Sequence, residues 1–295
     1  MRKRLSGLAF VLGIIALLGA RGSMAQSWQA GFQLGGTNYY GELQEKGFDL
    51  SQSRFMFGIA GAYHLNGRLS LQGSIFKGNI TGADHASNNI ASQQRNLSFA
   101  TRLYEVGLAG RFNILDIEKH TLVPYVFGGI AVFRINPYAF AQDGAKLYLI
   151  PLSTEGQSLP NYPERQRASL YNFSLPFGGG LSARLNEFWS LDFELGYRKT
   201  FTDYIDDVST YYADPALLLS AFGPRSVEMA YRGGELPNGN PNYPGTGSLR
   251  GTPASKDWYY AGLIRLNYTF GGRKTSAGSS GPSYNKKQYA CPTVY

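Results

Sequence analysis

Apolar and polar residues alternate with a period of two along several stretches of the chain, and the clearest is residues 258–270, WYYAGLIRLNYTF. One face of this stretch begins at Trp258 and ends at Phe270, with apolar residues between these aromatic ends. This order is typical of a β-strand that meets lipid on one side and has its ends at the two membrane interfaces. The other face carries Arg265 and Asn267, so we expect it to line a polar interior.

Six further stretches alternate in the same way, and each predicts a strand: residues 28–40, 54–65, 68–80, 103–112, 171–185 and 189–198. Residues 121–133 predict one more strand, the fifth along the chain. Asn66-Gly67 is typical of a two-residue hairpin turn, and Asn186-Glu187 is a second short turn. The fifth strand, at 121–133, is apolar on both faces, so its pattern does not indicate which face meets lipid.

The connections between these strands alternate strictly between short and long. The short ones lie at residues 66–67, 116–120 and 186–187, and the long ones at 42–52, 81–96, 136–167 and 204–257. Outer-membrane barrels have short periplasmic turns and long outer loops. We therefore predict an all-β fold: an eight-stranded antiparallel transmembrane barrel in the outer membrane, contacting its lipids, with extracellular long loops and both termini in the periplasm.

The N-terminus has the features of a secretory signal peptide. A basic segment at residues 2–4 precedes an apolar run at 5–20, and the small residues ending at Ala25 fit a cleavage site. A membrane-anchor helix is the alternative, but glycines interrupt the run and Arg21 follows it. The predicted organisation is a signal peptide at 1–25, a barrel at 26–270 and a flexible periplasmic tail at 271–295.

The composition agrees with a β-rich chain that has many turns, because 14% of the residues are aromatic, 16% are charged and 37 are glycine. The formal net charge is +8, and removal of four basic residues with the signal peptide leaves about +4. This charge is too small to indicate nucleic-acid binding. The sequence has no phosphate-binding glycine loop and no metal-ligand spacing, so we expect no cofactor.

Several predicted strands place charged residues on the inward face. Side chains fill the interior of an eight-stranded barrel, and an unpaired charge there costs several kcal/mol. We therefore expect Arg265 to face Asp192 and Glu194, and the other inward charges to join one network that plugs the lumen. An ion pathway is the less favoured alternative. The network consists of Glu105, Arg111, Arg184, Asp192, Glu194 and Arg265.

Aspartates gather where the seventh strand ends, at Asp203, Asp206, Asp207 and Asp214. Two interpretations stay open, a calcium site and a solvated loop with a helix cap, and the second is favoured because the spacing is not that of an EF-hand. Asp214 followed by Pro215 predicts the start of a short helix in the longest loop.

Two segments resemble the markers of a known family: GGTNYYGEL at residues 35–43 and TFTDYIDDVSTYYAD at residues 200–214. They are similar to the PorG family of outer-membrane barrels, which belong to the type IX secretion system of Bacteroidota. The family often has aspartate where this chain has Glu42. The resemblance implies a non-enzymatic barrel that associates with a periplasmic ring made of a lipoprotein and a soluble subunit. Tyr268 and Phe270 also resemble the C-terminal strand signal that the barrel assembly machinery reads.

The tail is rich in glycine and serine and then becomes basic and aromatic, which is typical of a linker leading to a binding segment. The chain has one cysteine, Cys291, so an intramolecular disulfide is excluded. An intermolecular disulfide and a free thiol both remain open in the oxidising periplasm. Given the resemblance, we expect the tail to dock on the ring, with Cys291 linked to the ring lipoprotein. The expected contacts are Lys286, Lys287, Tyr289, Cys291, Pro292 and Tyr295.

A lipid-modifying enzyme and a surface-binding protein are the two alternative classes of function. Lipid-modifying enzymes on small barrels use a histidine with a serine or threonine at the outer leaflet. Here His64 and His120 fall near short connections, which leaves His85 in a long loop without an evident partner. A surface binder or adhesin is the other alternative, because the long loops are rich in tyrosine, proline and glycine.

Overall fold

The computed structural model describes residues 27–44, 52–165, 167–252 and 255–271. The predicted signal peptide and almost all of the predicted tail lie outside the described residues. Eight long strands form the wall, and most begin and end within two residues of their predicted limits, whereas β3 ends three residues later and β4 begins five residues earlier than predicted. They are β1 Ser27–Tyr40, β2 Arg54–His64, β3 Leu69–Ala83, β4 Ser98–Asn113, β5 Leu122–Arg134, β8 Tyr171–Arg184, β9 Trp189–Thr200 and β10 Trp258–Thr269.

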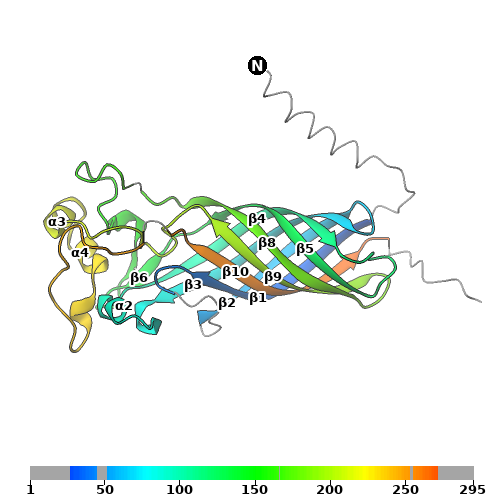
Figure 1. Cartoon of the computed structure of the whole chain (residues 1–295), viewed down its shortest axis with the longest axis horizontal. Helices are drawn as coiled ribbons and strands as arrows, with labels where there is room; N and C mark the ends of the chain where they lie inside the picture. The colour runs from blue at the N-terminus through cyan, green and yellow to red at the C-terminus, as the bar shows by residue number, and fades with distance from the viewer. Residues whose placement is uncertain (1–26, 45–51, 166, 253–254, 272–295) are drawn as a thin grey trace, which may run out of the picture.

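The eight strands close into a barrel in which every neighbouring pair is antiparallel (Figure 1). Neighbours follow the order β3-β2-β1-β10-β9-β8-β5-β4, and pairing of β3 with β4 closes the ring. The first and last strands pair over their whole length, from Gln29 opposite Thr269 to Tyr40 opposite Trp258. Closure leaves no free edge in the wall, as a membrane-spanning sheet requires. The predicted eight-stranded fold is confirmed.

Alternate residues of each strand point out of the barrel, and most of these outward residues are apolar. On β10 the outward face includes Ile264 and Leu266, while Arg265 between them is 2% exposed. The structure also assigns the faces of β5, because Ile130 is 63% exposed whereas Phe133 is buried. The inward face of β5 is aromatic, which explains why the sequence pattern of this strand did not separate its two sides. The barrel therefore has an apolar surface suited to lipid.

The long connections gather at one end of the barrel and the short turns at the other (Figure 1). We call the described parts of residues 41–44, 84–97, 135–170 and 201–257 the loop cap. Its elements are η2 Asp84–Ala86, α2 Ile90–Arg95, β6 Tyr138–Phe140, β7 Lys146–Tyr148, η3 Ile150–Leu152, α3 Pro215–Phe222, α4 Pro224–Ala230 and η4 Gly233–Glu235. No helix in the described part of the chain is long and apolar enough to cross a bilayer.

The predicted helix after Asp214 is confirmed as α3. The Asp214 side chain accepts a hydrogen bond from the backbone N–H of Ala216, Pro215 opens the helix, and Gly223 ends it with φ of 82°. Helices α2 and α4 and the β6–β7 hairpin were not predicted. Each of these elements has between three and seven residues, too few for a periodic pattern to emerge.

The loop cap packs into the mouth of the barrel around one apolar core. Inward side chains near the strand ends, such as Met56, Phe76 and Phe133, are at most 2% exposed. Loop residues join the same cluster, including Leu43, Leu97, Leu149, Ile205, Val208 and Met229. The cap is therefore a packed layer continuous with the barrel interior, because its burial of apolar surface depends on side chains from the wall.

Candidate functional site

The two segments that carry the family resemblance, residues 35–43 and 200–214, meet at the barrel mouth. Tyr39 at the end of β1 is fully buried. Its hydroxyl lies 2.7 Å from Asp206 Oδ2 and 2.8 Å from Asp257 Oδ1. Apolar side chains from both segments share the same buried cluster: Tyr39, Leu43, Ile205 and Val208. Two segments far apart in the sequence thus build one site.

The Tyr39 hydroxyl can hydrogen-bond with both aspartates at once only when one of the two carboxyl groups carries a proton. A tyrosine hydroxyl has one proton to donate and can also accept a hydrogen bond. Burial, followed by the charge of Glu42, raises the pKa of Asp206 well above its usual range. Burial and the charge of Asp206 raise the pKa of Asp257 in the same direction. Protonation of one carboxyl lets it donate to Tyr39, so that all three groups are hydrogen-bonded.

A third and a fourth carboxyl group extend this acidic cluster. One carboxylate oxygen from each of Glu42, Asp203 and Asp257 lies within 4.8 Å of the other two. Burial, then the charge of Asp203, raises the pKa of Glu42 to about 7, and burial raises the pKa of Asp203 to about 6. Oxygen ligands at this spacing could hold a hard cation such as Ca²⁺. The raised pKa values mean that, without a cation, Glu42 and Asp203 bind protons more tightly than carboxyl groups in water do.

The favoured interpretation of this segment as a solvated loop is wrong. Asp203, Asp206 and Asp207 are each at most 2% exposed, because the cap folds over them. The predicted helix cap is confirmed at Asp214, which precedes the first residue of α3. The acidic cluster also contains Glu42 and Asp257, neither of which was assigned to it from the sequence. Glu42 lies in another connection, and Asp257 lies at the far end of the same one, next to β10.

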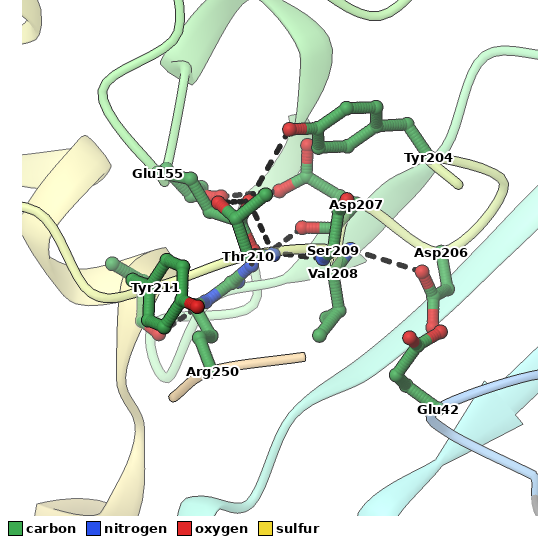
Figure 2. Close-up of polar contacts among 12 residues, drawn as sticks. Glu42, Glu155, Tyr204, Asp206, Asp207, Val208, Ser209, Thr210, Tyr211 and Arg250 are labelled. Atoms are coloured by element: carbon green, nitrogen blue, oxygen red, sulfur yellow. Dashed lines mark hydrogen bonds and ion pairs between the residues drawn. The ribbon is translucent and has the colours of Figure 1, made fainter. Parts of the chain in front are cut away.

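The side chain of Glu155 contacts several residues of the second marker segment, as Figure 2 shows. It is fully buried, and its Oε1 accepts the backbone N–H of Ser209 at 2.8 Å. Its Oε2 accepts the Thr210 hydroxyl at 2.6 Å and the Tyr204 hydroxyl at 3.3 Å. One carboxylate from the connection between β7 and β8 therefore fixes the conformation of the marker segment.

Arg250 supplies the positive charge that balances Glu155. Its Nη1 lies 2.9 Å from Glu155 Oε1 and donates to the carbonyl oxygen of Asp207 at 2.5 Å (Figure 2). Its Nε donates to the carbonyl oxygen of Ala230 at the end of α4. Arg250 thus joins three parts of the cap. Neither Arg250 nor Glu155 was predicted, because both lie in connections with no periodic pattern.

A pocket of about 560 Å³ opens beside the acidic cluster. Polar and aromatic side chains from several connections line it, including Glu42, Arg95, Tyr212, Tyr231, Arg250 and Ser255. Arg95 forms an ion pair of 2.7 Å with Asp84, which is fully buried. The pocket is large enough for a peptide or sugar segment, and its hydrogen-bonding groups suit a polar ligand.

The lumen of the barrel contains paired charges. Arg111 Nη1 lies 2.7 Å from Asp192 Oδ2, and Arg265 Nη2 lies 3.1 Å from Glu194 Oε2. Arg265 also lies 3.8 Å from Asp192, so these four residues form one group. The Arg111 guanidinium stacks at 3.6 Å from the ring centroid of Tyr125. The structure therefore brings together four of the six residues of the expected network.

The other two residues of that network lie apart from these four. Glu105 pairs with Arg198 at 3.4 Å and accepts a hydrogen bond from the Tyr259 hydroxyl. Arg198 lies on the inward face of β9, so the period-two pattern of this strand could have placed it in the expected network. Placing Arg184 in the network is wrong, because its Nη1 donates to the carbonyl oxygen of Glu118 at 3.3 Å beside a short turn.

The proposed assembly signal lies on the lipid face. Tyr268 packs against the rings of Trp189 and Phe270, with centroids 5.1 and 5.3 Å apart. The Phe270 side chain is 55% exposed, and its backbone N–H donates to the carbonyl oxygen of Trp28. Recognition by the assembly machinery stays a prediction. The tail contacts expected at Lys286, Lys287, Tyr289, Cys291, Pro292 and Tyr295 lie outside the described residues.

The closed wall, its apolar exterior and its plugged lumen define a transmembrane β-barrel of the outer-membrane type. The chain belongs to a family described as a domain of unknown function, DUF6089, whose model matches residues 8–218. No curated protein matches the sequence.

Solved outer-membrane barrels are similar to the chain at a distance. The N-terminal barrel domain of Pseudomonas aeruginosa OprF is 10% identical, with 83% of this chain and 100% of that chain covered and a TM-score of 0.36. Ail of Yersinia pestis is 13% identical, with 83% and 97% covered and a TM-score of 0.35. Neisserial surface protein A is 9% identical, with 82% and 96% covered and a TM-score of 0.39. These likenesses are too distant to indicate a function.

Proposed function

We propose that this barrel is a non-enzymatic component of a type IX protein secretion machinery and that it anchors a periplasmic ring of lipoprotein and soluble subunits to the outer membrane. The observation that carries the proposal is the junction of the two marker segments. Tyr39 from the first segment and Asp206 from the second form a buried hydrogen bond of 2.7 Å. The residues that carry the resemblance therefore act as one structural unit.

The packed lumen supports an anchoring role over a transport role. The ion pair of Arg111 with Asp192 joins strands β4 and β9 across the interior, and Arg265 with Glu194 adds a pair between the neighbouring strands β10 and β9. Each of these residues is buried. The apolar core of the loop cap then fills the mouth above them. A barrel of eight strands has little interior space beyond its own side chains. Cargo would have to pass beside this barrel, through another component.

A buried contact between a histidine and a serine is the feature that an enzymatic interpretation would use. His64 Nδ1 lies 2.7 Å from Ser70 Oγ, but both residues are at most 5% exposed and lie at the short-turn end. A hydrolase needs its nucleophile open to substrate. We therefore assign the pair a structural role within the lumen.

The proposed orientation places the loop cap outside the cell and residues 271–295 in the periplasm. In this arrangement the tail reaches the ring, with Cys291 joined to the ring lipoprotein by a disulfide. Lys286 and Lys287 add contacts that weaken as salt is raised. Tyr289, Pro292 and Tyr295 supply the apolar part of the contact.

Purification of the full chain in mild detergent from its native host tests this proposal. The ring lipoprotein and its soluble partner should co-purify, and non-reducing electrophoresis should show an adduct that reductant and Cys291→Ser both remove. A chain lacking residues 286–295 should lose the ring proteins. Recovery of the barrel without ring proteins under every mild extraction would contradict the proposal.

A surface-binding role is the second candidate, and the pocket of about 560 Å³ in the loop cap favours it. Replacing Tyr231 and Arg95, which line this pocket, separates the two functions. A binder would lose its ligand in these variants while the ring proteins still co-purify. A secretion component would keep both its ring proteins and protein export.

A further inference from the structure

The charged residues on the lipid face of the barrel are all basic and all lie toward the long-loop end. Among the outward positions of the eight wall strands that the structure describes, the charged ones are Lys77, Arg102, Arg134 and Lys199. None of the four forms an ion pair with a carboxylate within the described residues. Toward the short turns, the outward positions carry Trp28 and Trp189 and no charge.

Strand pairing alternates these cations with aromatic rings. Lys77 lies opposite Phe57 on one side and Tyr104 on the other. Tyr104 in turn lies opposite Arg134, and Arg134 lies opposite Tyr171. An unbroken row of aromatic and basic residues therefore crosses five neighbouring strands, β2, β3, β4, β5 and β8. On the other side of the barrel, Lys199 lies opposite Trp258.

The rings hold the cations over the surface of the wall. Lys77 Nζ lies 5.7 Å from the ring centroid of Tyr104 and 5.9 Å from that of Phe57. The Arg134 guanidinium lies 5.9 Å from the ring of Tyr171, and Lys199 Nζ lies 5.7 Å from the ring of Trp258. Such contacts are favourable and leave the ammonium or guanidinium hydrogens free for an anion.

The position along the strands places this belt at a lipid–water interface. Lys77 and Lys199 are 9 and 11 residues along β3 and β9, counted from the short-turn end of each strand. A tilted strand crosses the hydrocarbon core in about 9–11 residues. Aromatic residues mark the same boundary. Lys77 and Lys199 therefore lie at the depth of the headgroups. Arg102 and Arg134, 12 and 13 residues from the short-turn ends of β4 and β5, lie at that boundary or just beyond it.

We propose that Lys77, Arg102, Arg134 and Lys199 form a basic belt that binds the phosphorylated headgroups of lipids in the leaflet at the long-loop end. The argument for this occupant is charge complementarity: four unpaired cations of one sign face a layer whose anionic groups are phosphates. If these cations did no more than reach water, basic residues would be equally suitable at the short-turn end. The outward positions of the described strands carry no charge there. The belt is independent of any role in export.

Native mass spectrometry of the full chain tests the belt, with lipid A as the probe and dephosphorylated lipid A as the matched probe. The wild type should retain lipid A through mild detergent and release the dephosphorylated form. Lys77→Gln with Lys199→Gln should weaken retention about 30-fold, the factor for two basic residues near an anionic surface. Lys77→Arg with Lys199→Arg should restore it.

Arg68→Gln with Lys119→Gln is the control, because it removes the same charge from exposed residues outside the wall strands. This variant should retain lipid A as the wild type does. Equal retention by the belt and control variants would overturn the proposal, as would equal retention of the dephosphorylated probe. Displacement by inorganic phosphate at the same phosphate concentration would show a small-anion site and would also overturn it.

Trp258 offers a second readout at the belt itself. The chain has three tryptophans, and Trp28 and Trp189 lie toward the short turns. In a variant that keeps Trp258 alone, lipid A in phosphatidylcholine nanodiscs should change its fluorescence, because Lys199 lies over its ring. A spectrum unchanged between lipid A and its dephosphorylated form would contradict binding at this position.

Discussion

The barrel lumen and the loop cap both bury charge, but they balance it differently. In the lumen each buried carboxylate faces an arginine from another strand, as in the pairs of Asp192 with Arg111 and of Glu194 with Arg265. In the cap, the acidic cluster has more carboxyl groups than nearby cations and depends on backbone N–H groups, hydroxyls and protons, as around Asp206 and Asp257. A fixed strand register places opposite charges together, whereas irregular backbone supplies its own donors.

Removal of a lumen cation should have the largest effect. Arg111→Leu leaves Asp192, which is 1% exposed, with only Arg265 at 3.8 Å. We expect a loss of about 3–5 kcal/mol in the free energy of unfolding, the usual effect of stranding a buried charge. Urea unfolding of the refolded barrel in detergent micelles measures it.

Arg184→Gln is the control, because this arginine binds only a backbone carbonyl oxygen and should cost about 1 kcal/mol. Equal losses for the two arginines would show that the lumen pairs do not stabilise the barrel. The lumen would then gain no stability from the arginines that face its buried carboxylates.

Exposed apolar residues should respond differently in the two regions. Ile130 on the wall and Leu219 on α3 are 63% and 53% exposed. Ile130→Arg should destabilise the barrel by about 2–4 kcal/mol, because a cation within the hydrocarbon part of the lipid face loses its hydration. Leu219→Arg should have almost no effect, because this residue faces water. Equal effects in lipid vesicles would mean that β5 does not cross the membrane as described.

Glu155→Gln should loosen the loop cap and leave the wall intact. The neutral amide keeps the shape but weakens the hydrogen bonds from Ser209 and Thr210, each worth about 1.5–3 kcal/mol to a charged acceptor. Hydrogen exchange at these two amides should speed up by one to two orders of magnitude, as that energy implies. Faster exchange in the wall strands as well would show that cap and wall unfold together.

Asp207 should make the stability of the loop cap depend on pH. Burial raises the pKa of Asp207 to about 7 from a usual value of 3.8. The folded cap therefore holds this proton more tightly than the unfolded cap does, and stability should fall as pH rises between about 4 and 7. Asp207 has φ of 68°, which asparagine also adopts, so Asp207→Asn should flatten the slope without strain. The measurement is hydrogen exchange corrected for its intrinsic pH dependence, and an unchanged slope would exclude Asp207 as its source.

The same contrast explains how much the sequence could predict. A period of two needs only a few residues to appear, so seven of the eight wall strands and the lumen pairs of Asp192 and Glu194 followed from it. Loop contacts have no such period. Glu155 and Arg250 are 95 positions apart and meet only because the cap folds over the mouth. The inward face of β5 was hidden because a packed lumen uses aromatic residues, such as Phe133, as well as charges.

Surface labelling tests most directly the central claim, that the loop cap faces outward from an eight-stranded barrel whose tail lies in the periplasm. The segment between Pro237 and Pro244 contains the exposed residues Asn238, Asn240 and Asn242, so we expect an epitope inserted there to leave the core intact. This epitope should be labelled on intact cells, and one inserted after Gly272 should be labelled only after the outer membrane is opened. Labelling of the second site and not the first on intact cells would contradict the account.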